Sequence, residues 1–161
     1  MTNLVPMCEQ EYLTFSTEAV PVYAAEKVAS GEWSQEESLE LARKAFADLL
    51  PQGIATKDNY FFTIQDATTT ATVGTLWIAA QVRGSKRIAY VYDVRIRSAH
   101  QRKGYASQSF LALEDEVRKL GLSGVALHVF GHNVAAQALY VKLGYQPTDI
   151  NMYKPVRPAG N

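Results

Sequence analysis

The stretch Val94–Ser107, VRIRSAHQRKGYAS, connects the end of a predicted strand to the start of a predicted helix. The first amides of a helix have no partners inside the helix, and the helix dipole places partial positive charge there. Gly104 has no Cβ, so a phosphate group can approach the backbone, and Gln101, Arg102 and Lys103 add side-chain donors. The stretch therefore predicts an anion-binding turn.

This turn differs from the common nucleotide-binding loops. It lacks the second and third glycines of a dinucleotide fingerprint, and no Gly-Lys-Ser/Thr sequence of a phosphate-binding loop follows it. A basic turn that contains glycine can also be merely solvent-exposed, and the stretch alone leaves that alternative open.

Upstream of the turn, apolar and polar residues alternate with a period of two, as is typical of strands. Short polar connections separate three such runs, which predicts an antiparallel meander of residues 60–65, 72–82 and 87–97. In the third run, strict alternation places Tyr90, Tyr92 and Val94 on one face. Asp93 and Arg95 are then expected on the opposite face.

Helical segments flank the meander. Residues 9–30 have helical composition with a kink expected at Pro21, and Ser34 with Glu37 forms a capping box before a second helix. Beyond the turn, the pattern predicts a helix over residues 104–120, a strand over 124–130, a helix over 134–143 and a last extended stretch over 145–154.

The order of these elements predicts an α/β (α+β) fold with a central mixed, mostly antiparallel sheet and helices on both sides. A chain of about 150 residues buries enough surface to fold without a disulfide or a structural metal. Residues 1–154 are expected to form a single domain, and residues 155–161 a disordered tail.

The composition excludes several classes of function. The 161 residues include 16 Lys and Arg against 16 Asp and Glu, so the chain lacks the net positive charge of most nucleic-acid binders. Cys8 is the single cysteine and has no Cys/His cluster around it, so we expect no metal site and a reducing compartment. No apolar stretch is long enough to cross a membrane and no leader pattern is present, which predicts a cytoplasmic protein.

Two blocks of sequence resemble those of the GNAT superfamily of acyl-CoA-dependent N-acetyltransferases. Residues 101–106, QRKGYA, are similar to the family's Gln/Arg-x-x-Gly-x-Gly/Ala signature, and they follow a strand as in that family. Residues 127–145, LHVFGHNVAAQALYVKLGY, resemble its second block of a strand, an Asn, a helix with a Tyr, and a Gly-Tyr exit. The resemblance covers residues 3–154 and is greatest to small N-acetyltransferases of Gram-positive bacteria. One departure is Ser98, where Pro is common.

The resemblance implies acetyl-CoA as the cosubstrate, with its pyrophosphate on backbone amides of the signature turn and its pantetheine arm along the preceding strand. The cofactor-binding residues implied in this way are Val94, Ile96, Gln101, Arg102, Lys103, Gly104, Tyr105, Ala106, Ser107 and Asn133. Tyr140 matches the Tyr that family members use as general acid towards the leaving thiolate. Both have structural alternatives, because Asn133 is also a good helix N-cap and Tyr140 could be a core residue.

The sequence leaves two alternatives for the identity of the general base. Acetyl transfer needs a neutral amine, and the ammonium pKa to overcome is about 10.4 for lysine but about 8 for an α-amine. Tyr90 stands where some family members have a Glu base. Members that acetylate protein N-termini resemble this chain in having such a Tyr with a His on the next strand, so Tyr90 and His128 are predicted to relay the proton through water. Asp93 is the rival base, provided that a β-bulge moves it to the same face.

The resemblance thus implies direct acetyl transfer, in a ternary complex, to a primary amine on a small molecule or a protein N-terminus. A homodimer is a further expectation. Two other classes stay open: a non-catalytic acyl-CoA-binding sensor would keep the turn and Asn133 but not need Tyr140, and a protein-interaction module would need none of these residues.

Overall fold

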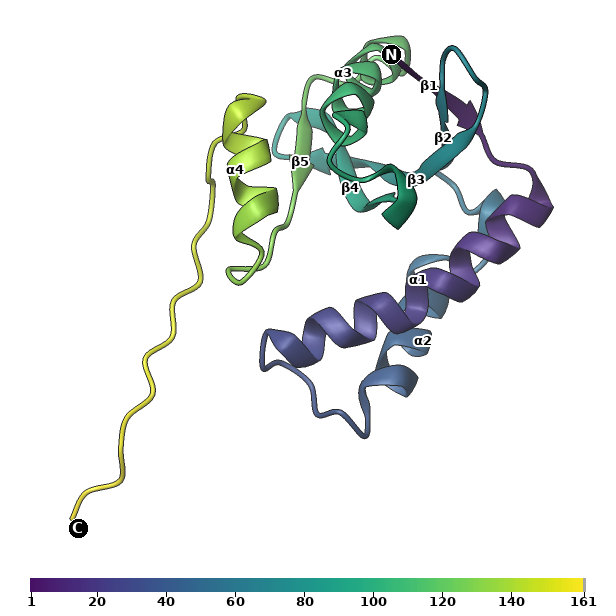
Figure 1. Ribbon diagram of the computed structural model, residues 1–161. Coiled ribbons are helices and arrows are strands. Elements are labelled where there is room, and N and C mark those ends of the chain that lie inside the picture. Colours follow the sequence, from purple (N-terminus) through teal and green to yellow (C-terminus); the bar gives the residue numbers. More distant parts are fainter. Residues whose placement is uncertain (161) are drawn as a thin grey trace.

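The computed structural model describes residues 1–160 of the chain (Figure 1). Its elements follow in the order β1 (Thr2–Pro6), α1 (Glu9–Ala29), α2 (Ser38–Leu49), η1 (Gly53–Ala55), β2 (Asn59–Asp66), β3 (Thr72–Arg83), β4 (Lys86–Ile96), η2 (Ser98–His100), α3 (Tyr105–Lys119), β5 (Val125–Leu127) and α4 (Val134–Lys142). The predicted α/β class is confirmed.

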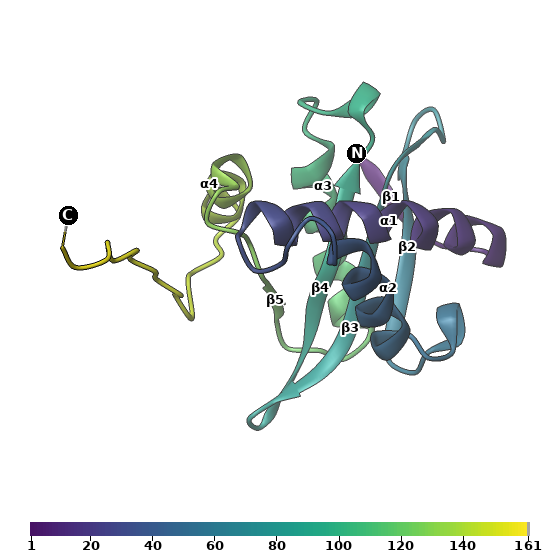
Figure 2. The ribbon, with the colours of Figure 1, turned by 90° about the horizontal axis from the view of Figure 1, so that it is seen from below.

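The sheet has five strands in the order β1-β2-β3-β4-β5. The first four pair antiparallel, and β5 lies parallel to β4. Figure 2 shows α1 crossing one face of this sheet, while α3 lies on the other. The expected mixed, mostly antiparallel sheet with helices on both sides is therefore confirmed.

The face that α3 covers is aliphatic. Phe110, Leu113 and Val117 recur along α3 at helical spacing and pack against inward-facing residues of the strands. The buried strand residues of this cluster are Phe62, Ile64, Val73, Leu76, Ile78, Ala89 and Val91. This cluster holds the sheet and α3 together through burial of apolar surface.

The face that α1 and α2 cover is aromatic. Tyr12 and Phe15 of α1 pack on Phe61 and Trp77 of the sheet, with ring centroids 4.9 Å apart for Tyr12–Phe61 and 6.3 Å apart for Phe15–Trp77. The helix α1 begins where the Cys8 amide donates to the Glu11 carboxylate, and it continues through Pro21.

Three predictions of local structure were wrong. The capping pair Ser34 and Glu37 does form, but a turn follows it and α2 begins at Ser38. The strand expected over 124–130 is limited to β5, and residues 145–154 form no strand in the described chain. The prediction of a disordered tail over 155–161 stays a prediction, and Asn161 lies outside the described residues.

Candidate active site

A β-bulge in β4 decides which side chains reach the candidate site. Asp93 pairs with Trp77, but the next pair is Val91 with Ile78, so Tyr92 is an extra residue. The strict alternation predicted for this strand is therefore wrong. A bulge sends neighbouring side chains to one face, and here Tyr90, Tyr92 and Asp93 all line the same cavity.

The bulge also moves the far end of β4 to the aliphatic face. Val94 and Ile96 pack against the α3 cluster together with Ala89 and Val91, although strict alternation separates these two pairs. The three-residue step from Val91 to Val94 replaces the usual step of two, as expected when one residue is inserted.

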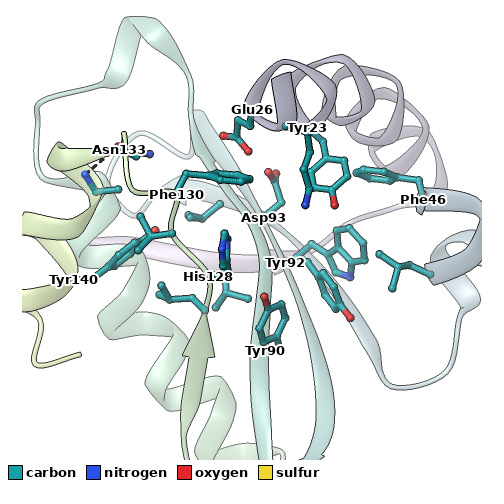
Figure 3. Close-up of a pocket in the computed structure, with 18 residues that line it drawn as sticks. Tyr23, Glu26, Phe46, Tyr90, Tyr92, Asp93, His128, Phe130, Asn133 and Tyr140 are labelled. Atoms are coloured by element: carbon teal, nitrogen blue, oxygen red, sulfur yellow. Dashed lines mark hydrogen bonds between the residues drawn. The ribbon is translucent and has the colours of Figure 1, made fainter. Parts of the chain in front are cut away.

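The cavity opens where β4 and β5 part. The two strands pair only from Ala89–Val125 to Val91–Leu127, whereas β4 continues to Ile96. The cavity measures about 390 Å³. Figure 3 shows Asn133 and Tyr140 at one end, Phe46 at the other, and Asp93 and Glu26 between them. Its lining residues are Tyr23, Glu26, Lys27, Phe46, Leu49, Trp77, Tyr90, Val91, Tyr92, Asp93, Val94, Leu127, His128, Val129, Phe130, Asn133, Ala136 and Tyr140.

Asp93 is the most perturbed acid of the site. Burial raises the pKa of its carboxyl to about 6, because desolvation disfavours the charged form. The Arg95 guanidinium, 3.8 Å from the carboxylate, opposes this rise, and the charge of Glu26 adds to it. The Oδ2 atom is buried without a hydrogen-bond partner among the described residues. A carboxyl group with such a pKa is ionised at pH 7 and still accepts protons readily.

Glu26 is a second carboxyl group in the cavity. It lies on α1, and burial raises its pKa, while the nearby His132, Arg95 and His128 partly offset this rise. Sequence reasoning missed Glu26, since one Glu on a helix with Lys27 beside it has the appearance of a solvated face. The aromatic lining residues Tyr23 and Phe46 were missed because an aromatic residue on a helix is ordinarily interpreted as part of the core.

Tyr140 projects from α4 into the cavity. Its ring packs edge-on against Phe110 and Tyr145, with centroids 5.3 Å and 5.8 Å away. Burial raises the pKa of its hydroxyl, and the charges of Asp93 and Glu26 raise it further. The hydroxyl is therefore protonated at neutral pH and can donate a proton or a hydrogen bond.

His128 and Tyr90, the predicted relay, both line the cavity. His128 is exposed, and its ring meets Phe130 edge-on at 4.9 Å. Tyr90 is half-buried, with its ring 4.8 Å from that of Tyr92 and the Arg83 guanidinium 5.3 Å from its centroid. Burial raises the pKa of the Tyr90 hydroxyl, so this group is a poor proton acceptor at pH 7.

Asn133 forms the predicted helix cap and also lines the cavity, while its contact with the cosubstrate stays a prediction. It is the N-cap of α4, where its side-chain oxygen accepts a hydrogen bond from the Ala136 amide at 3.2 Å. It also lines the cavity at the α4 end. The cap fixes the start of the helix that carries Tyr140. The cap uses only the side-chain oxygen of Asn133, and its side-chain NH2 group takes no part in it.

The turn before α3 has the backbone of an anion site. Arg102 has φ 64° and Gly104 has φ 83°, both in the left-handed region, and Gly104 caps the helix. Within residues 1–160, the first α3 amide with a partner is that of Gln108, which donates to the Gly104 carbonyl; the six amides of residues 102–107 are free. Consecutive free amides at a helix start form a concave anion-binding site.

Two side chains predicted to bind the anion form hydrogen bonds within the turn in this structure, and their contact with an anion stays a prediction. The Gln101 side chain donates to the Ile96 carbonyl at 3.0 Å, and the Lys103 ammonium donates to the Ala99 carbonyl at 3.1 Å. The Tyr105 hydroxyl donates to the Asp66 carboxylate at 2.7 Å. These bonds hold the free amides in place beside the end of β4.

The sequence profile of the acetyltransferase (GNAT) family matches residues 22–145. The chain belongs to this family. Among curated proteins, it is 36% identical to a protein named uncharacterized N-acetyltransferase YycN of Bacillus subtilis, over 94% of this chain and 96% of that protein. It is 32% identical to YdgE of the same organism, another uncharacterized N-acetyltransferase, over 94% of this chain and 96% of that protein.

Solved structures agree with this membership. The crystal structure of Bacillus subtilis YycN superimposes with a TM-score of 0.92 at 34% identity, covering 98% of this chain and 100% of that chain. An acetyltransferase structure from Pyrococcus furiosus has a TM-score of 0.70 at 23% identity, over 97% of this chain and 100% of that chain, and shows the shared fold. This GNAT chain is thus an acetyltransferase of a family that uses acetyl-CoA as its cosubstrate.

The described part of the GNAT chain gives two further findings. Residues 1–160 contain no group of three His, Cys, Asp or Glu side chains arranged to hold a metal ion. None of the helices described there is long and apolar enough to span a membrane.

Proposed function

We propose that this GNAT protein transfers the acetyl group of acetyl-CoA directly to a primary amine in a ternary complex. The observation that carries the proposal is the cavity between β4 and β5, which ends at Tyr140 on one side and contains Asp93 at its centre. A protonated phenol and a perturbed carboxyl group in one cavity are the acid and the base that this reaction needs.

Acetyl-CoA is expected to lie along the parting of the strands. Its pyrophosphate would accept hydrogen bonds from the free amides of residues 102–107. Its pantetheine arm would extend along β4 past Ile96 and Val94, with Asn133 on the opposite wall. The Ile96 carbonyl already accepts the Gln101 side chain, so in this arrangement Val94 is the stronger candidate for a backbone bond to the arm.

The chemical step has a defined course. We assign Asp93 the role of general base: it takes a proton from the acceptor ammonium, and the freed lone pair attacks the thioester carbonyl carbon. The tetrahedral intermediate then expels CoA thiolate as the carbon–sulfur bond breaks. Tyr140 protonates the leaving thiolate, the nitrogen of the intermediate then loses its second proton through solvent to the Tyr140 phenolate, and the neutral amide product carries the acetyl group. No covalent bond to the enzyme forms.

His128 is the second candidate base, because it lines the same cavity and an imidazole is a common general base in catalysis. The bulge favours Asp93, since it turns this buried carboxylate into the cavity that Tyr140 also lines, whereas His128 is exposed. Water would have to connect His128 and Tyr90 to the amine.

The cosubstrate site is tested with two glycines in the same left-handed conformation. Gly104→Val places a branched side chain over the free amides, and Gly121→Val puts the same side chain at the other end of α3. Neither position has a close obstacle to a Cβ other than the Gln108 amide group near Gly104. Calorimetry with acetyl-CoA should show weaker binding for the first variant by about 10- to 100-fold, as for lost bonds to a charged group. Equal affinity for both variants would contradict the placement.

The chemistry is tested by following CoA release with a panel of primary amines. Tyr140→Phe should lower kcat by about 10²- to 10⁴-fold, the usual effect of losing a general acid, with nearly unchanged acetyl-CoA affinity. Unchanged turnover would remove Tyr140 from the mechanism. Tight binding of acetyl-CoA without turnover of any amine by the wild type would instead favour an acyl-CoA sensor.

A further inference from the structure

The end of the cavity remote from α4 is lined by rings. Tyr23 and Phe46 lie 5.9 Å apart, Phe46 and Trp77 lie 5.5 Å apart, and Trp77 stacks on Tyr92 at 4.5 Å. Leu49 of α2 completes this wall. Figure 3 shows the ring of Tyr92 and that of Phe46 on the far side of Asp93 from Tyr140. A ligand that enters this end exchanges water for aromatic surface.

The charges of the cavity are concentrated in its middle. Among its lining residues, the carboxyl groups are Glu26 and Asp93. The Lys27 ammonium lies beside the aromatic end, 5.7 Å from the Tyr23 centroid, and is bonded to Glu32 at 2.6 Å. A cationic nitrogen is therefore favoured next to the two carboxyl groups, whereas a second one farther along would meet the like charge of Lys27.

From this arrangement we propose that the acceptor is a monoamine with an apolar, preferably aromatic, body attached to the carbon chain that carries the nitrogen. The ammonium lies between Asp93 and Glu26, and the body lies against Tyr92, Phe46 and Leu49. This substrate class rests on the proposed acetyl transfer. It excludes polyamines and other acceptors with a second cationic nitrogen as preferred substrates.

The test compares 2-phenylethylamine with 1,5-diaminopentane as acceptors for the full-length enzyme. The wild type should have the higher kcat/KM for 2-phenylethylamine. Leu49→Asp adds a carboxylate to the aromatic end and should lower kcat/KM for the aromatic amine by about 10-fold or more, the scale of a changed specificity pocket. The same variant should raise the relative rate with the diamine.

Leu39→Asp is the matched control, because Leu39 lies on the same helix with the same exposed fraction of 39% but does not line the cavity. It should leave both rates unchanged. A wild-type preference for the diamine, or equal effects of the two substitutions, would overturn the proposed substrate class while leaving acetyl transfer intact. Absence of CoA release with every amine would overturn acetyl transfer itself.

Discussion

On one face of β4, Ala89 and Val91 pack against α3 in an aliphatic cluster, whereas on the other face Tyr90 and Tyr92 border a cavity that contains Asp93. The first face is dry and closely packed, and the second carries rings, a buried carboxyl group and a polar atom without a partner. One inserted residue, Tyr92, separates the two patterns. The difference indicates that one face stabilises the fold, whereas the other contains a buried carboxyl group, Asp93, that lowers stability but can serve in catalysis.

The largest expected effect is on turnover, at the cavity face. Asp93→Asn should lower kcat/KM by about 10²- to 10⁴-fold, because the amide cannot accept the proton. His128→Ala should have a much smaller effect. The two variants, assayed with one active amine, discriminate directly between the two candidate bases. The reverse ranking would assign the base to His128 and Tyr90.

A second large effect is expected at the aliphatic face. Leu113 is fully buried, and Leu113→Ala should lower the free energy of unfolding by about 2–5 kcal/mol through lost burial and a residual cavity. Turnover per folded molecule should stay at the wild-type value. Leu111→Ala on the exposed side of the same helix should change stability by no more than about 0.5 kcal/mol. A loss of specific activity in Leu113→Ala would contradict the claim that the aliphatic face affects stability and not turnover.

The smallest effect concerns the turn at the end of β4. Tyr105→Phe removes the hydrogen bond to Asp66, whose pKa is held below its usual range by bonds from the Thr69 amide, the Tyr105 hydroxyl and the Thr68 amide. A lowered pKa contributes stability above the unfolded value of 3.8 and loses it as the pH falls. Urea unfolding should therefore show a small deficit for Tyr105→Phe at pH 7 that shrinks at pH 3. A deficit independent of pH would contradict this account.

Regular periodicity made much of the fold predictable. The meander and the helix with Phe110, Leu113 and Val117 follow directly from spacings of two and of three to four residues. The bulge was foreseen only as a possibility, because one extra residue leaves no mark in a sequence of alternating side chains. The strand expected over 145–154 did not form, and residues 146–160 extend away from the sheet without pairing with a strand of the described chain.

The site was predictable on one side of the cavity only. Tyr90, His128, Asn133 and Tyr140 belong to strands and a helix with recognisable sequence blocks, and all four line the cavity. The opposite wall comes from α1 and α2, which are brought there by tertiary packing. A residue such as Glu26 has no local signal, because its distance from Asp93 in the chain says nothing about their proximity in space.

The most direct test of the central claim measures the difference in unfolding free energy between Asp93→Asn and wild type as a function of pH. Burial raises the pKa of Asp93 from 3.8 to about 6, so the native state holds this proton more tightly than the unfolded state does. Wild-type stability contributed by Asp93 is therefore present below pH 4 and lost as the pH rises towards 6. The account predicts that Asp93→Asn equals wild type at low pH, becomes more stable by up to about 3 kcal/mol above pH 6, and is catalytically impaired. An Asp93→Asn variant that is less stable than wild type at pH 8, or that retains full turnover, would contradict it.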